Sequence, residues 1–133
     1  MALRRMFHKD IVLSDRFIEM PTRCQALYFQ LAMNADDEGF VGGAFRIARS
    51  IGVRQSDLQI LVQKGFIHLF DHGVAYIENW HRQNRVPKHQ FKPTIYWRER
   101  NFLGIKDVIQ FDEEMELQRE LENKRNAAAF KTF

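Results

Sequence analysis

Two glutamines spaced four positions apart, Gln59 and Gln63, stand out as residues that could recognise a chemical pattern. This spacing places both side chains on one face of a helix. A glutamine amide can form two hydrogen bonds with adenine, so such a helix could contact base edges in the major groove of DNA. Glutamines on an exposed helix face are also common without any such role. The predicted contact residues of this segment are Arg54, Gln55, Gln59, Gln63 and Lys64.

A run of basic residues follows Trp80. Residues 79–104 carry a net charge of +5, whereas residues 22–78 sum to −1. Lysine and arginine bind the phosphate backbone and supply most of the salt-dependent affinity for nucleic acid. The alternative is an ordinary charged surface. We expect four of these cations to provide much of the affinity for DNA: Arg82, Arg85, Lys88 and Lys92.

Aromatic residues are interleaved with this basic run, and two prolines interrupt it. Aromatic side chains can stack on bases, but they can equally anchor an extended segment to a domain, and we favour anchoring. Pro87 and Pro93 exclude a continuous helix. The aromatic residues are Trp80, Phe91, Tyr96 and Trp97.

The glutamines belong to a predicted helix followed by a hairpin. Ser56 is the predicted N-cap, because its hydroxyl can accept a free amide of the first turn. Leu58, Leu61 and Val62 then share one helical face. Gly65 is expected to end the helix. The apolar runs 66–70 and 74–77 flank a turn at residues 71–73, which predicts a β-hairpin.

Three further helices are predicted upstream, with a short strand before the last of them. Ser14 can cap a helix over residues 15–20, and residues 22–34 show apolar residues at helical spacing. A short extended piece over residues 40–43 precedes a helix that ends at Gly52. Helix, short turn, helix and hairpin predict an α+β, mainly α fold: a winged helix-turn-helix with a small antiparallel β-hairpin (the wing) and a C-terminal helix.

The remaining polar clusters are interpreted as solvated. Asp36, Asp37 and Glu38 are expected to form a solvent-exposed turn, and Asp57 is expected to lie on the exposed face of the glutamine helix. An exposed Asp57 would be unfavourable near phosphate. The predicted core consists of Leu27, Leu31, Ile47, Ile51, Leu58, Leu61, Val62, Phe66, Ile67 and Ile77.

No catalytic or metal-binding pattern is found, so we expect neither enzymatic activity nor a cofactor. The sequence contains no phosphate-binding glycine loop, no H-E-x-x-H pair and no nucleophile elbow. Cys24 is the only cysteine, which excludes an internal disulfide and fits a reducing cytosol. No apolar run approaches the roughly 20 residues of a membrane helix. We therefore expect a cytosolic protein with no membrane contact.

Two parts of the chain are expected. Residues 1–104 form the predicted winged-helix domain with its basic segment, and residues 105–133 form a connector and an acidic C-terminal helix over residues 112–129. The apolar stripe of that helix is narrow, so we expect it to contact a partner or a second copy of the chain.

Several separated blocks resemble the N-terminal domain of phage replisome organisers. They are RRMFHKDIV, Met20-Pro21, ALYFQLAMNADDEGFVG and IENWHRQNRVPKHQFKPTIY, in this order, and they span roughly residues 4–97. The resemblance implies a phage or prophage winged helix that binds duplex DNA at a replication origin, with a role related to that of DnaD-type primosome proteins. A helicase loader or another replication protein is an implied partner.

Two other functions use the same predicted fold. The chain could be a winged-helix transcriptional regulator, or a protein-interaction module whose glutamine helix contacts a partner protein. The weakly charged glutamine helix keeps the second alternative open.

Overall fold

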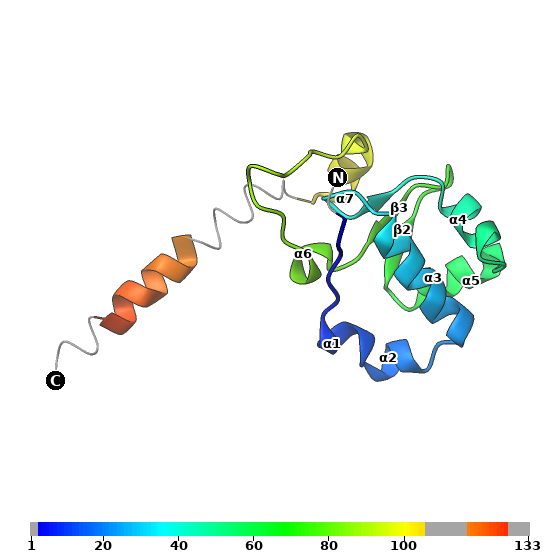
Figure 1. The fold of residues 1–133 in the computed structure, drawn as a ribbon, viewed down its shortest axis with the longest axis horizontal. Coiled ribbons are helices and arrows are strands. Elements are labelled where there is room, and N and C mark those ends of the chain that lie inside the picture. Colours follow the sequence, from blue (N-terminus) through cyan, green and yellow to red (C-terminus); the bar gives the residue numbers. More distant parts are fainter. Residues whose placement is uncertain (1–2, 106–116, 128–133) are drawn as a thin grey trace. The chain divides into compact units, whose positions relative to one another are not determined.

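The computed structural model describes residues 3–105 and 117–127, which fall into two compact units, Met1–Tyr96 and Trp97–Phe133. The described residues are mainly helical and contain one small three-stranded antiparallel sheet. The predicted α+β, mainly α class is therefore confirmed (Figure 1).

The first unit contains six helices and three strands in the described residues. The sheet has the order β1-β3-β2, with Phe40 opposite Tyr76 and Ile67 opposite Ile77. Helices α3, α4 and α5 lie together at one side of the sheet, whereas α6 lies at the other (Figure 1). The elements are α1 Lys9–Val12, α2 Asp15–Ile18, α3 Thr22–Met33, β1 Phe40–Val41, α4 Ala44–Ser50, α5 Gln55–Gln63, β2 Ile67–Leu69, β3 Ala75–Ile77 and α6 Trp80–Gln83.

The core forms where α3 meets α5 and the sheet. Phe17, Tyr28 and Phe66 meet in edge-on contacts with ring centroids 5.3 to 5.8 Å apart. Edge-on packing suits the quadrupoles of aromatic rings and stabilises them beyond simple burial. Seven predicted core residues are buried: Leu27, Leu31, Leu58, Leu61, Phe66, Ile67 and Ile77. The other three, Ile47, Ile51 and Val62, are only half-buried, because α4 and the outer side of α5 are covered on fewer sides.

The predicted hairpin forms, and its turn rests on α4. The turn at residues 71–73 ends at Gly73, whose φ of +87° favours glycine. The carbonyl of Gly73 accepts a hydrogen bond from the amide of Ala44, 2.9 Å away. A Cβ at Gly73 would lie 3.1 Å from the Phe45 ring, so the turn closes tightly against the start of α4.

The N-terminal boundaries of two helices differ from expectation. Helix α5 begins at Gln55 with Arg54 at the N-cap, so the prediction of Ser56 as the cap is wrong. Helix α1 was not predicted; it begins after His8, whose ring nitrogen accepts the amide of Asp10. Ser14 does cap α2, accepting the amide of Phe17 as expected.

The second unit contains α7, Trp97–Leu103, and a helix over residues 117–127. This second helix lies inside the predicted acidic helix; residues 112–116, 128 and 129 of that prediction lie outside the described residues. Its apolar side chains Leu117 and Leu121 are exposed. Within the described ranges, no helix has the length and apolar character needed to cross a membrane.

Candidate nucleic-acid interface

Helix α5 divides sharply into a buried and an exposed face. Leu58 and Leu61 are fully buried against the core. Gln55, Gln59 and Gln63 are exposed and recur every four residues along the helix. Because positions four apart lie on one helical face, their three amides form a row on the outer surface of the unit.

Asp57 does not lie on this exposed face, contrary to expectation. Its side chain is buried, and one carboxylate oxygen accepts the amide of Arg54 at 3.0 Å, which satisfies a free donor at the start of α5. The other oxygen accepts Nε of Arg23 at 2.8 Å. Burial alone would raise the pKa of Asp57, but these hydrogen bonds outweigh burial and hold the pKa below its ordinary range. Asp57 is therefore a paired capping group rather than an exposed negative charge.

Cations from earlier helices lie at both ends of α5. At its start, Arg23 and Arg54 line one cavity of about 390 Å³ together with Gly52, Ser56 and Asp57. At its end, the guanidinium of Arg16 stacks over Phe66, next to Gly65, and Lys64 is the C-cap residue. Sequence reasoning missed Arg16 and Arg23, because only the packing of α2 and α3 brings them to α5.

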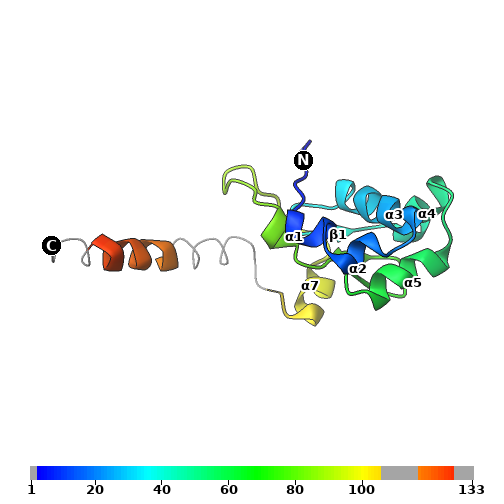
Figure 2. The same ribbon diagram turned by 90° about the horizontal axis from the view of Figure 1, so that it is seen from below.

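The four cations expected after the hairpin lie away from α5. Arg82 belongs to α6, and the others follow it in a non-helical segment that includes a turn at residues 88–90. As expected from Pro87 and Pro93, no continuous helix forms there. The segment lies at the end of the first unit opposite α5 in both views (Figures 1 and 2). The structure thus separates the predicted contact residues into two surfaces. We name them the α5 surface, comprising Arg54, Gln55, Gln59, Gln63 and Lys64, and the basic loop, comprising Arg82, Arg85, Lys88 and Lys92.

The side chains of the basic loop are exposed. Arg82 forms an ion pair with Asp10 at 3.4 Å, and both partners are more than half exposed, so solvent screens it strongly. The aromatic residues behave differently from one another: Trp80 is fully buried, whereas Phe91 and Tyr96 are half-buried. Trp80 thus anchors the beginning of the segment, in agreement with the expected anchoring role. Trp97, at 50% exposure, belongs to the second unit.

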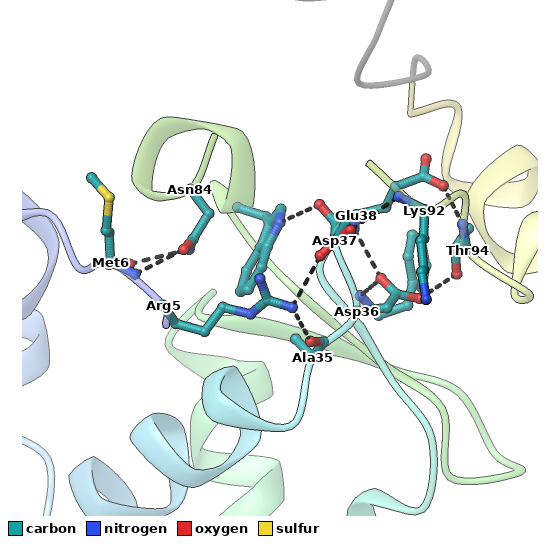
Figure 3. A network of polar contacts seen from close by, with 11 residues as sticks. Arg5, Met6, Ala35, Asp36, Asp37, Glu38, Asn84, Lys92 and Thr94 are labelled. Atoms are coloured by element: carbon teal, nitrogen blue, oxygen red, sulfur yellow. Dashed lines mark hydrogen bonds and ion pairs between the residues drawn. The ribbon is translucent and has the colours of Figure 1, made fainter. Parts of the chain in front are cut away.

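The acidic turn is buried, which corrects the expectation that it is solvated. Asp37 and Glu38 are 4% and 1% exposed. Asp37 accepts the main-chain amide of Lys92 at 3.0 Å, and Glu38 accepts that of Thr94 at 2.6 Å. The hydroxyl of Thr94 donates to Asp36 (Figure 3). We name these five residues the latch, because their contacts hold the end of the basic loop against the domain.

A second set of contacts connects the latch to the N-terminal segment. The Arg5 guanidinium donates to the carbonyl of Ala35 at 2.7 Å and forms a buried ion pair with Asp37 at 3.3 Å (Figure 3). It also lies 5.2 Å from the ring centroid of Trp80, whose indole N–H donates to the carbonyl of Asp37. Burying both charges would be costly without these partners, so the ion pair and its hydrogen bonds must persist together.

Asp36 stabilises the acidic turn by accepting hydrogen bonds from main-chain amides of the turn and of β1. Its carboxylate accepts the amides of Glu38 and Phe40, each at 3.0 Å. Burial raises the pKa of Asp36, and the hydrogen bonds from Thr94, Phe40 and Glu38 oppose that rise. All three acidic residues therefore act on main-chain donors of the fold. Within residues 3–105 and 117–127, no three His, Cys, Asp or Glu side chains form a group that could hold a metal ion.

Comparisons with protein families, curated proteins and solved structures found no match to this chain.

Proposed function

We propose that the first unit is a winged helix-turn-helix that binds duplex DNA with α5 in the major groove. In this assignment α3, α4 and α5 are the three helices, β1 is the small first strand, and β2 and β3 are the wing. The order β1-β3-β2 and the helix pair α4 and α5, joined by residues 51–54, support it.

The observation that carries the proposal is the outer face of α5. Three exposed amides at four-residue spacing lie on a helix whose opposite face is buried. Arg54 and Lys64 lie at the two ends of this helix, and its one acidic residue, Asp57, is buried in an ion pair with Arg23. Amides can hydrogen-bond to base edges while the flanking cations bind phosphates.

The proposed biological role is initiation of replication at a phage or prophage origin. It rests on the resemblance of residues 4–97 to phage replisome organisers. The Lys92-Pro93-Thr94 motif of that resemblance coincides with the latch, so the resemblance includes residues that hold the basic loop in place. A helicase loader or another replication protein is the partner that such a role requires. A transcriptional regulator would use the same α5 surface at a different DNA site.

The test is duplex binding measured by fluorescence anisotropy at two salt concentrations. Replacing Gln59 and Gln63 by Ala should reduce discrimination between an origin fragment and random duplex, by about 1–3 kcal/mol for each lost base contact. The Arg54→Ala/Lys64→Ala variant should weaken all sequences alike and flatten the salt slope by about two units.

A control equal in charge uses the exposed cations of the second unit. The Arg119→Ala/Lys124→Ala variant removes the same charge from the helix over residues 117–127 and should leave the salt slope unchanged. If the Arg54→Ala/Lys64→Ala and Arg119→Ala/Lys124→Ala variants change binding equally, the effect reflects net charge, and α5 is not the recognition helix. Specific binding upstream of the chain's own gene, with none at the origin, would favour the regulator.

A further inference from the structure

The basic loop is a second cationic surface, separate from the α5 surface. No aspartate or glutamate occurs between Glu78 and Glu99, so the loop carries its cations without an acidic residue among them. The four cations are spaced three, three and four positions apart, with Arg82 in α6, Lys88 in a turn and Lys92 near the end of the loop. Exposed cations gathered on one loop suit the phosphates of a polyanion.

Buried polar contacts hold the loop at its beginning. On α6, Gln83 donates to the hydroxyl of Tyr28 at 2.8 Å and accepts the amide of His8 at 3.0 Å. Asn84 exchanges two hydrogen bonds with the main chain of Met6, at 2.8 and 3.1 Å. Because both amides are buried, this end of the loop is tied to the N-terminal segment and to α3.

The latch holds the other end through the amides of Lys92 and Thr94. Asp37 binds Lys92 through its main-chain amide, and the Lys92 side chain is exposed. Between the two anchors, Val86 is buried and the amide of Gln90 donates to the carbonyl of Pro87. A loop fixed in this way loses little conformational freedom when it binds a partner.

We propose that the basic loop binds a second segment of duplex DNA, so that one domain bridges two segments. The α5 surface and the loop lie at opposite ends of the first unit (Figures 1 and 2), so each could contact a different segment of DNA. Phe91, the only Phe, Tyr or Trp within residues 82–92, is half-buried. Single-strand binding relies on exposed aromatic platforms, so the loop favours phosphate contacts on a duplex. This proposal rests on the proposed function only for the DNA segment that the α5 surface binds.

The experiment is a capture assay with the full chain and two duplexes. One origin duplex is immobilised, the protein is added, and capture of a second, fluorescent duplex is measured at low salt. The loop variant replaces Arg82, Arg85, Lys88 and Lys92 by Ala, which retains the Lys92 amide that the latch binds. It should still bind the immobilised duplex through α5 but capture the second duplex about ten-fold less or worse.

Two matched variants separate the possible failures. The Arg98→Ala/Arg119→Ala/Lys124→Ala/Arg125→Ala variant removes the same charge from the second unit and should capture normally. The Arg54→Ala/Gln59→Ala/Gln63→Ala/Lys64→Ala variant should lose sequence discrimination, while its loop still binds duplex with a strong salt dependence. Circular dichroism melting of each variant confirms that it is folded.

The outcomes are distinct. If the folded loop variant captures the second duplex as well as the unmodified chain does, capture arises from self-association and the proposal is overturned. Absence of capture by the unmodified chain, despite tight binding of the first duplex, also overturns it and leaves the α5 surface intact. If the α5 variant retains discrimination while the loop variant loses binding, the proposed function fails and the loop remains a DNA-binding surface. Preference of the loop for single-stranded DNA would overturn the assignment to duplex.

Discussion

Nε of Arg23 lies 2.8 Å from Oδ1 of Asp57, which joins the first turn of α3 to the first turn of α5. The same carboxylate accepts the amide of Arg54, so one buried group caps α5 and fixes it against α3. Because Arg23 balances the charge of Asp57, Arg54 supplies the remaining positive charge at the cavity beside the start of α5.

Removing this cap should destabilise the domain. We expect Asp57→Ala to lower the free energy of unfolding by about 1–3 kcal/mol, because the Arg54 amide loses its acceptor and the cap is lost. The Arg23 pair contributes little, since that side chain is 58% exposed. Urea denaturation measures the change. Gln59→Ala, on the exposed face of the same helix, is the control and should change stability by less than about 0.5 kcal/mol.

Asp57 should make the free energy of unfolding depend on pH in the acidic range. Its pKa is lowered on folding, so its contribution is complete above the ordinary value of 3.8 and is lost as pH falls through the folded value. Asp36 acts in the opposite sense: because its pKa is raised on folding, its contribution falls as pH rises from the ordinary value of 3.8 through the folded value. The stability difference between the unmodified chain and Asp57→Asn isolates Asp57. It should shrink below about pH 4. A difference independent of pH would contradict this assignment.

Trp80 packs so closely against Gly39 that adding a side chain at position 39 should destabilise the fold. A Cβ at Gly39 would lie 2.5 Å from Cγ of Trp80, and φ is +90°. Gly52→Ala is the matched control, because φ there is +78° and nothing lies within 4 Å of the added Cβ. Gly52→Ala should cost about 1–2 kcal/mol from backbone strain alone. We expect Gly39→Ala to cost clearly more in thermal or urea unfolding. Equal losses would show that Trp80 can move aside.

Breaking the latch should loosen the loop before it affects the sheet. Glu38→Ala removes the acceptor of the buried Thr94 amide, which should cost about 1–3 kcal/mol. Amide hydrogen exchange should accelerate at Lys92 and Thr94 because the loop opens locally. The amide of Ile77, which donates to the carbonyl of Gly39, serves as the reference and should change only if the whole unit is destabilised. Unchanged exchange at Thr94 would contradict the latch.

The helix over residues 117–127 should contribute to self-association rather than to the stability of the first unit. Leu117 and Leu121 lie one helical turn apart and are 58% and 50% exposed. Replacing both by Ser should lower the molecular mass in solution, measured by sedimentation, and leave the unfolding of the first unit unchanged. Gln118→Ser and Glu122→Ser in the same helix are the control. If the mass stays the same in both variants, these leucines do not mediate self-association.

The order of elements from α2 to β3 followed from local sequence signals, whereas the short helices α1, α6 and α7 were not predicted. Helical spacing in α3 and α5, the positive φ of Gly65, and the turn before Val74 are short-range features, so the helices and the hairpin could be predicted without tertiary contacts. The exposed row of Gln55, Gln59 and Gln63 follows from the same periodicity.

Tertiary structure alone decided the environment of the charges. Asp37 and Glu38 occur in a stretch typical of a solvated turn, but they are buried because Arg5 and the amides of Lys92 and Thr94 reach them from 32 to 56 positions away. The same long-range packing brings Arg23 to α5 and separates the basic loop from it. Charge patterns along a chain carry no information about which distant donors will meet a carboxylate, so burial and pairing emerge only when the helices pack.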